Sequence, residues 1–263
     1  MNSIDVKLDA ELRKHPLLAI AFSGGCDSAF LAEAARRTLG GEHLLLVLAD
    51  SPLLPRREFD AALAWAERAG LPLAVCEVTP LERPEVRANT PERCYHCKRM
   101  IFGALQREAS LRGFPVLADG TNCDDLGDYR PGLRAAEELG VLHPLLAAGF
   151  TKAMIRERSR EWGLSTWDLP AAACLASRIP TGTPLSSGAL SRVEAAEEQL
   201  RRRGFRAVRV RDLSGKKARI ELPPEELSRA EAVREELAAA LAGCGYSEVE
   251  LALYRTGSMN RPL

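Results

Sequence analysis

The segment Ser-Gly-Gly-Cys-Asp-Ser that begins at Ser23 carries the most specific chemistry in this sequence. Gly24 and Gly25 permit backbone angles that turn consecutive N–H groups into one concavity, and Ser23 and Ser28 add hydroxyl donors. The apolar run that ends at Phe22 predicts a buried strand, and the spacing after Ser28 predicts a helix. Because the turn lies at the positive end of that helix, these residues predict an anion-binding site.

The type of phosphate loop follows from Asp27. A Walker A loop needs a lysine at that position, whereas a carboxylate there is better suited to hold Mg²⁺. The segment resembles the signature of the PP-loop ATP pyrophosphatases. That resemblance implies that the loop holds the β,γ-pyrophosphate of ATP as leaving group while a substrate oxygen attacks the α-phosphorus. The alternative is a glycine turn that serves packing alone, which many doubly wound proteins contain.

The cysteines form a second group of reactive candidates. Seven cysteines in a chain without a secretion signal argue against a disulfide framework. Cys94 and Cys97 form a CxxC, which is typical of zinc, of a redox disulfide or of an iron–sulfur cluster, with two incidental thiols as the alternative. Cys174 lies in a segment, 168–185, that is rich in Ala, Pro, Gly and Thr and predicts both a domain boundary and a binding loop. No role is predicted for the others: Cys26, Cys76, Cys123 and Cys244.

Further candidates follow predicted strands and helix starts. Asp50 ends a second apolar strand, 43–50, and is expected near the nucleotide, with loop solvation or a helix cap as the alternative. Gly120 ends a later strand and permits close approach of the backbone to a ligand. Lys152 begins a predicted helix, where the dipole disfavours a cation, so it is expected to contact polyphosphate unless it is simply exposed. An acidic loop either binds metal or only solvates the chain: Asp124, Asp125 and Asp128.

The predicted elements place these candidates in two domains. Apolar runs that alternate with helical patterns up to residue 170 predict an α/β fold, a doubly wound and mostly parallel sheet. Residues 171–263 predict a smaller α+β domain. On its first strand, alternation puts Arg209 and Arg211 on one face, as a phosphate or carboxylate clamp or as an ordinary solvated face. The helices are predicted at 3–14, 56–69, 150–164, 190–203 and 224–242, and further strands at 71–78, 205–212, 216–223 and 246–253.

The amino-acid composition limits the classes of partner that this protein is expected to bind. The 263 residues contain 36 Lys plus Arg and 36 Asp plus Glu, so no global charge attracts the protein to nucleic acid or to an acidic membrane. The first residues contain no apolar signal region, and no apolar run has the length of a membrane span. A cytoplasmic protein without nucleic-acid or membrane partners is expected.

Motifs spread over residues 17–260 resemble the LarE family. They are SGGCDS, NTPERCYHCK, DGTNCDD with DYRPGL, ACLASRIPTG, VRVRD with ARIELP, and YRTGSMN. Members of this family are ATP-dependent sulfur transferases that make the nickel-pincer nucleotide cofactor of lactate racemase. The resemblance implies that the substrate is pyridinium-3,5-biscarboxylic acid mononucleotide, whose carboxylates become thiocarboxylates.

The family uses two sources of sulfur. In one, a cysteine that matches Cys174 gives up its own sulfur and becomes dehydroalanine; in the other, three cysteines bind a 4Fe–4S cluster that carries an extra sulfide. The single-cysteine members lack the CxxC, so Cys94, Cys97 and Cys174 together imply the cluster type. Cofactors are then ATP, Mg²⁺ and the 4Fe–4S cluster, and the further partners are a sulfide donor and copies of the chain in a homohexamer.

The resemblance also assigns roles to single residues. It implies that Ser177 and Arg178 lie near the reacting carboxylate and phosphates and that Arg209 and Arg211 hold the phosphate of the substrate. Acidic positions that match possible ligands of a divalent metal are Asp27, Glu197 and Glu221.

Three rival functions are weighed against this one. A PP-loop tRNA thiolase with a cluster would need a basic face or an RNA-binding domain. An amide-forming PP-loop synthetase, such as those making NAD or GMP, would use ammonia and no cluster. A non-catalytic nucleotide-binding module with a structural zinc would need a fourth ligand besides the three thiols, for example His96.

Overall fold

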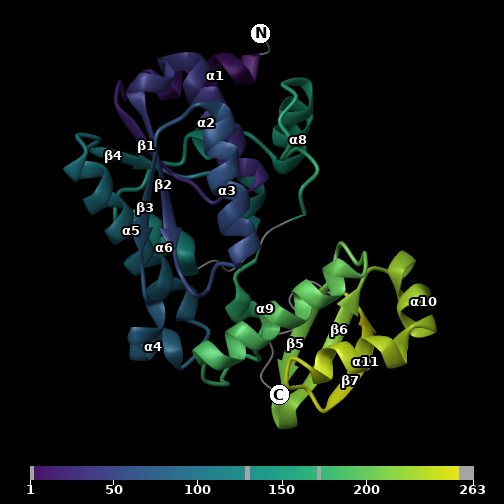
Figure 1. Cartoon of the computed structure of the whole chain (residues 1–263). Helices are drawn as coiled ribbons and strands as arrows, with labels where there is room; N and C mark the ends of the chain where they lie inside the picture. Colours follow the sequence, from purple (N-terminus) through teal and green to yellow (C-terminus); the bar gives the residue numbers. More distant parts are fainter. Residues whose placement is uncertain (1–2, 128–130, 171–172, 255–263) are drawn as a thin grey trace. The chain divides into compact units, whose positions relative to one another are not determined.

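The computed structural model describes residues 3–127, 131–170 and 173–254 (Figure 1). Contacts divide the chain into two compact units, and each is described here by itself. Unit 1 comprises Met1–Pro80 and Cys94–Ala172, and unit 2 comprises Leu81–Arg93 and Ala173–Leu263. The described residues leave out the first three residues of the DYRPGL motif, which begins at Asp128. They also leave out all but the first residue of the YRTGSMN motif.

Unit 1 is built on a four-stranded parallel sheet with the order β3-β2-β1-β4, which confirms the predicted doubly wound fold. Alternate residues of a strand face opposite sides. Leu18 and Ile20 therefore belong to one apolar core and Ala19 to another on the opposite face of the sheet. The strands are β1 (Leu18–Ala21), β2 (Leu44–Asp50), β3 (Leu73–Glu77) and β4 (Val116–Ala118).

Helices cover both faces of this sheet (Figure 1). Their apolar stripes supply the two cores, because residues at helical spacing on one side of each helix are buried. One core is covered by α1 (Ser3–Leu12), α2 (Cys26–Leu39), α3 (Arg56–Ala69), α7 (Pro144–Ala148) and α8 (Lys152–Glu161). The other is covered by α5 (Arg93–Leu111) and α6 (Pro131–Glu138).

Unit 2 contains a three-stranded mixed sheet with the order β5-β6-β7. Its core gathers Val210 and Ile220 from the strands with Leu200 and Leu237 from the helices, which matches the predicted α+β pattern. The expected helix over 224–242 is broken at Val233, where a new helix begins. The elements are α9 (Ser187–Arg202), β5 (Arg209–Leu213), β6 (Lys217–Leu222), α10 (Pro224–Ala232), α11 (Arg234–Ala242) and β7 (Glu248–Leu253).

The segment 81–93 also belongs to unit 2, although it precedes α5 in the sequence. It contains the short helix α4 (Pro84–Arg87) and the buried residue Asn89. Backbone hydrogen bonds join this segment to the chain around residues 182–185. An expected boundary at 170/171 follows composition along the chain, whereas this association depends on contacts between residues about ninety positions apart.

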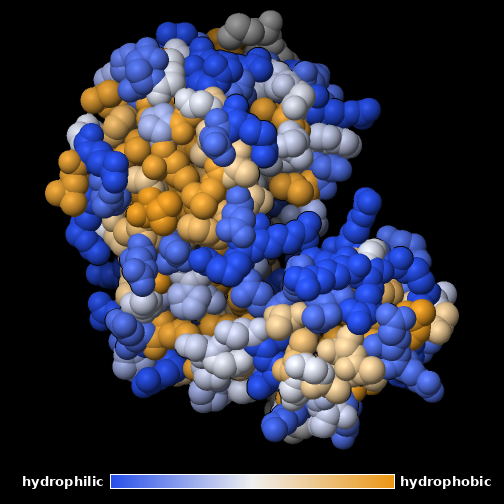
Figure 2. Space-filling model, in the orientation of Figure 1, coloured by the Kyte–Doolittle hydropathy of each residue, from blue (hydrophilic) through white to orange (hydrophobic). Residues whose placement is uncertain are grey.

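Figure 2 shows an apolar area on the visible face of unit 1, around the place where Figure 1 labels β2 and β3. β3 is an edge strand of the sheet, and its residue Val75 is 44% exposed. Apolar surface at a sheet edge is a feature that other chains or copies commonly cover.

No helix within the described ranges is long and apolar enough to cross a bilayer.

Candidate active site

The loop between β1 and α2 forms the floor of the candidate site. Gly24 has a φ of +72°, a left-handed conformation that glycine adopts without strain. A Cβ at Gly24 would also lie 2.8 Å from the Cβ of Ala62 in α3. Ser28 Oγ lies 3.2 Å from Ser23 Oγ and accepts a hydrogen bond from the Ser23 N–H at 3.3 Å. Sequence, backbone angle and packing therefore fix the turn in one conformation.

The start of α2 is open to a ligand. Gly25 is its N-cap, and among the residues that the structure describes no side chain caps this helix. The first N–H groups of a helix have no partners within the helix and carry its positive dipole end. This arrangement binds phosphate in many proteins, so the geometry fits the anion site that the sequence predicts.

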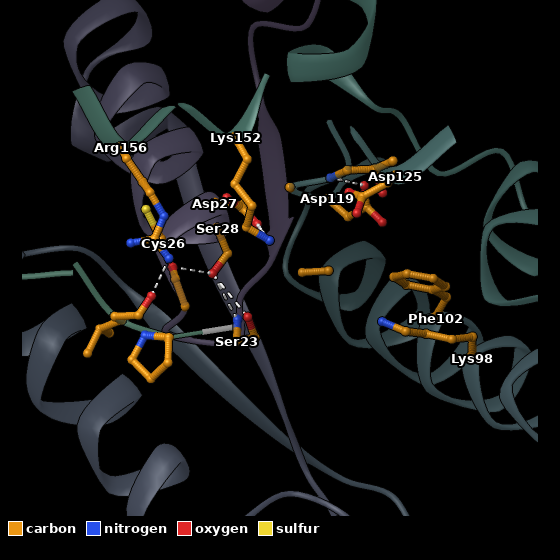
Figure 3. Close-up of a pocket in the computed structure, with 16 residues that line it drawn as sticks. Ser23, Cys26, Asp27, Ser28, Lys98, Phe102, Asp119, Asp125, Lys152 and Arg156 are labelled. Carbon is orange, nitrogen blue, oxygen red and sulfur yellow. Dashed lines mark hydrogen bonds and ion pairs between the residues drawn. The ribbon is translucent and has the colours of Figure 1, made fainter. Parts of the chain in front are cut away.

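A hollow of about 340 Å³ opens above this loop (Figure 3). All of its lining residues belong to unit 1. Its volume falls within the range of small-ligand sites. Besides Ser23, Gly25, Cys26, Asp27 and Ser28, the lining includes Lys98, Phe102, Asp119, Gly120, Thr121, Asp125, Lys152, Arg156, Leu169 and Pro170.

Asp27 and Lys152 face each other inside the hollow (Figure 3). The ammonium nitrogen of Lys152 lies 3.6 Å from Asp27 Oδ2. Burial raises the pKa of the Asp27 carboxyl, and the charge of Lys152 opposes that rise only in part. Within the described part of the chain, Asp27 Oδ1 is buried without a hydrogen-bond partner. A buried carboxylate oxygen without a donor fits a bound divalent cation such as Mg²⁺.

Gly120 closes the hollow from the end of β4. A Cβ at this position would lie 2.9 Å from the backbone nitrogen of Ser28 and 3.0 Å from the carbonyl carbon of Asp27. The close approach explains why the sequence has glycine here. It also brings the β4 end against the start of α2, as expected for the carboxyl ends of neighbouring parallel strands.

Asp119 and His143 form a buried pair beside this glycine. His143 Nδ1 lies 2.7 Å from Asp119 Oδ1, and the same oxygen accepts a hydrogen bond from the Thr121 N–H at 3.0 Å. Burial disfavours charge on both side chains. Their hydrogen bond and mutual attraction outweigh it, so the pKa of His143 is raised and the pKa of Asp119 is lowered. The pair fixes the chain on both sides of Gly120.

The acidic loop and α8 are joined by Asp124. Its Oδ2 accepts a hydrogen bond from the Lys152 N–H at 2.5 Å, at the first residue of the helix. Thr151 caps the same helix, as expected, by accepting from the Met154 N–H. Asp125 Oδ2 accepts a hydrogen bond from the Asn122 N–H at 3.0 Å. These contacts order the loop around the hollow.

Asp50 lies at the end of β2, as expected, where it forms an ion pair with Arg56 at 2.8 Å. Arg56 begins α3, so the pair joins the strand end to the next helix. The predicted contact between Asp50 and ATP stays a prediction.

Cys174 is exposed in unit 2 and directly precedes a short 3₁₀ helix, Leu175–Arg178. The backbone carbonyl of Cys174 accepts hydrogen bonds from Ser177 Oγ at 2.8 Å and from Arg178 Nη1 at 3.1 Å. Arg178 has no exposed surface and forms an ion pair with Glu197 at 2.9 Å. Burial opposes charge on Glu197, but Arg178 and Arg201 lower its pKa. Ser177 and Arg178 therefore hold the backbone that carries the thiol.

Arg209 and Arg211 lie on β5, opposite Glu221 and Arg219 of β6. Arg211 is only 5% exposed; it donates to Glu221 Oε2 at 2.6 and 2.9 Å and to the backbone carbonyl of Ser177 at 2.9 Å. Arg211 thus reaches the same backbone as Arg178. The predicted phosphate clamp and the predicted metal role of Glu197 and Glu221 stay predictions. Both glutamates form ion pairs with guanidinium groups, and Glu197 Oε1 also accepts a hydrogen bond from the Val210 N–H at 3.2 Å.

Cys94 and Cys97 lie on the first turn of α5, both partly exposed. Residues three apart on a helix lie on neighbouring positions of one face. These two thiols belong to unit 1 and Cys174 to unit 2. The three-thiolate cluster stays a prediction.

Several lining residues were missed by reasoning from sequence. Lys98 directly follows the CxxC and lies over the Phe102 ring at 4.8 Å, and Arg156 lies one helical turn after Lys152. Arg156 donates to the backbone carbonyls of Trp167 and Leu169, and Leu169 lines another wall of the hollow. The spacing of Lys152 and Arg156 was a usable signal, because residues i and i+4 share a helix face. His143 gave none, since its partner Asp119 lies 24 positions away.

Comparisons with known proteins place the chain among relatives of matching length. A scan against protein-family models finds no match. The chain is 39% identical over 248 residues to an uncharacterised protein of Synechocystis sp., covering 93% of this chain and 92% of that protein. It is 31% identical to an uncharacterised protein of Methanocaldococcus jannaschii, covering 95% and 97%.

One relative has a named activity. The chain is 35% identical over 258 residues to the pyridinium-3,5-bisthiocarboxylic acid mononucleotide synthase of Lactiplantibacillus plantarum, covering 97% of this chain and 93% of that enzyme. Identity at this level over nearly the full length of both chains establishes common ancestry and fold, and the motifs quoted above span the same residues. The chain therefore belongs to the LarE family.

Proposed function

We propose that this protein is an ATP-dependent sulfurtransferase that converts the carboxylates of pyridinium-3,5-biscarboxylic acid mononucleotide into thiocarboxylates, for the nickel-pincer cofactor of lactate racemase. The observation that carries the proposal is the full-length similarity to a synthase named for that product. The hollow over the Ser23–Ser28 loop supports it, because this chemistry needs ATP.

The reaction consists of two balanced transfers. A substrate carboxylate oxygen attacks the α-phosphorus of ATP, the bond to the β-phosphate breaks, and an acyl-adenylate and pyrophosphate form. Hydrosulfide sulfur then attacks the acyl carbon, AMP leaves, and a thiocarboxylate and one proton result. Adenylation is required because a carboxylate oxygen is a poor leaving group, whereas AMP is a good one.

The residues of unit 1 are suited to the first transfer. The open N–H groups at the start of α2 and the hydroxyls of Ser23 and Ser28 would bind the pyrophosphate. Asp27 would hold Mg²⁺ through its unpartnered oxygen, and Lys152 would turn from Asp27 to the phosphates. Lys98 and Arg156 supply further positive charge around the hollow, where charge develops as pyrophosphate leaves.

Cys94, Cys97 and Cys174 are suited to hold a 4Fe–4S cluster, since all three thiols are at least partly exposed. Three thiolate ligands would leave one iron without a protein ligand, and the sulfide that is transferred would bind there. Ser177 and Arg178 hold the Cys174 backbone in place for that role. The alternative is a sacrificial Cys174 that gives up its own sulfur, which its exposure also permits.

The remaining expectations also rest on the family resemblance. They are a separate sulfide donor and a homohexamer, to which the apolar area of unit 1 would contribute contact surface. A cytoplasmic location is expected from the sequence itself.

The experiment that tests the proposal measures pyrophosphate release from ATP with and without the pyridinium dicarboxylate nucleotide. Release that requires the nucleotide supports it, and release driven by tRNA instead would favour a tRNA thiolase. Iron and sulfide content of protein reconstituted without oxygen, compared between wild type and Cys174→Ala, tests the cluster. About four irons per chain in wild type, lost in the variant, are expected.

A further inference from the structure

Asn89 is a buried polar residue for which the sequence suggests no role. It follows α4, has no exposed surface and has a φ of +54°. Asparagine is among the few residues other than glycine that adopt this left-handed conformation at low cost. A buried amide must be hydrogen-bonded, so its partners show what it holds.

The side-chain amide of Asn89 bonds with the segment after Cys174 and with Arg93, while its backbone N–H donates to the carbonyl of Val86 in α4. Asn89 Nδ2 donates to the backbone carbonyls of Pro180 at 2.8 Å and Thr183 at 2.9 Å. The backbone carbonyl of Asn89 accepts from the Gly182 N–H at 2.9 Å. Asn89 Oδ1 accepts from Arg93 Nη1. Asn89 Nδ2 also lies 3.5 Å from the carbonyl oxygen of Ile179, so one residue binds four positions of a turn that has no regular secondary structure of its own.

Arg93 extends these contacts toward the thiol. Its Nη1 also donates to the backbone carbonyl of Ala176 at 3.2 Å, two residues after Cys174. We call the contacts of Asn89 and Arg93 with residues 176–183 the Asn89 clamp. From the other side, Arg178 and Arg211 bind the carbonyls of residues 173, 174 and 177. Together the two sets hold the backbone from 173 to 183.

This arrangement matters because Cys174 itself is exposed. An exposed side chain has little packing of its own, so its position depends on the backbone that carries it. Every backbone carbonyl bound by the Asn89 clamp lies within nine residues of Cys174. Loss of the Asn89 clamp would free the backbone around residues 180–183, while the contacts of Arg178 and Arg211 with residues 173, 174 and 177 would remain.

We propose that Asn89 and Arg93 are positioning residues for sulfur transfer, because the Asn89 clamp fixes the segment that presents Cys174. The inference rests on the proposed function for its chemical consequence. It assigns no contact between Asn89 and substrate. The residues proposed to bind ATP belong to unit 1, whereas the Asn89 clamp belongs to unit 2. Adenylation and sulfur transfer should therefore respond differently to loss of the clamp.

The variant that tests this is Asn89→Gly. Glycine keeps the left-handed backbone without strain and removes only the amide contacts. Hydrogen exchange in peptides covering 175–185 should rise at least about tenfold, while exchange in β5 and β6 stays unchanged. Ser186→Ala, which removes the cap of α9 in the same unit, is the matched control.

The functional readout is the amount of thiocarboxylate formed per pyrophosphate released. Asn89→Gly should lower this ratio several-fold, because adenylation continues while transfer fails, and Ser186→Ala should not change it. Arg93→Met keeps the donors of Asn89, so it covers the case in which Asn89→Gly fails to fold, and should lower the ratio less. An unchanged ratio with unchanged exchange in both variants would overturn the inference. Wild type that releases no pyrophosphate with the nucleotide would instead overturn the proposed function.

Discussion

The ammonium nitrogen of Lys152 lies 3.6 Å from a carboxylate oxygen of Asp27. Both residues lie in the first turn of a helix and line the same hollow, Asp27 in α2 and Lys152 in α8. A cation is disfavoured at a helix start, so Lys152 gains from the neighbouring carboxylate. We infer that Mg²⁺ and the phosphates of ATP separate this pair, with the metal taking Asp27 and the phosphates taking Lys152.

Asp27→Asn should lower pyrophosphate release by about 100-fold or more, because it removes the charge proposed to hold Mg²⁺. The size of the side chain is kept, so the fold of unit 1 should not change. Titration of pyrophosphate release with Mg²⁺ checks this. Iron content should equal that of wild type, and unchanged release at low Mg²⁺ would show that Asp27 does not serve the metal.

Gly120→Ala should weaken ATP binding by about tenfold or more, since its Cβ would lie 2.9 Å from the Ser28 nitrogen and displace the start of α2. Gly188→Ala is the control, because a Cβ there meets no atom within 4 Å. Calorimetric titration with ATP measures both. Equal affinities of the two variants would contradict the role given to this close approach.

The fold was predictable where local patterns decide it. The helix at 56–69 and the Thr151 cap of α8 follow from spacing and from the chemistry of helix ends, and the structure has both. The attachment of residues 81–93 to unit 2 was not predictable, because it depends on Asn89 and carbonyls some ninety positions away. A break at Val233 within an apolar helical pattern gave no signal in the sequence.

Arg211→Lys should raise the KM for the pyridinium dicarboxylate nucleotide several-fold and leave the KM for ATP unchanged. Lysine keeps a positive charge beside Glu221 but lacks the planar fork that binds phosphate and carboxylate. Arg219→Lys, at the position paired with Arg211 across β5 and β6, is the control. Steady-state kinetics with each substrate varied measures both KM values. If Arg211→Lys changed the KM for ATP as much as the KM for the nucleotide, the result would count against a phosphate clamp.

The Asp119–His143 pair should stabilise the protein most between about pH 4 and pH 6.5, the ordinary pKa values of the two groups. The raised pKa of His143 gives a contribution that is complete below pH 6.5 and is lost as the pH rises through that raised value. The lowered pKa of Asp119 gives a contribution that is lost as the pH falls through that lowered value.

His143→Gln should therefore cost about 1–2 kcal/mol of unfolding free energy at pH 5.5 and less at pH 9. Urea denaturation of wild type and variant at the two pH values measures the difference. A cost that is the same at both would mean that His143 is neutral in the folded protein throughout.

The candidate site was predictable in its motifs and less so in its connections. Ser23, Asp27, Ser28, Gly120 and Lys152 line one hollow together, as strand ends and helix starts imply. From the sequence, Arg178 and Arg211 are expected to offer their charge to a ligand. In the structure each is buried, and each forms an ion pair with a glutamate and contacts the backbone near Cys174. Sequence shows that a charge is present, but its partner depends on tertiary contacts.

In the proposed function, one protein chain carries out ATP-dependent sulfur transfer many times. Counting the thiocarboxylates formed per protein chain tests this most directly. Protein reconstituted without oxygen would be incubated with MgATP, sulfide and pyridinium-3,5-biscarboxylic acid mononucleotide, and product, AMP and pyrophosphate measured together. Several thiocarboxylates per chain are expected, each with one AMP and one pyrophosphate, and the mass at Cys174 should not change. At most one thiocarboxylate per chain, with sulfur lost from Cys174, would contradict this expectation.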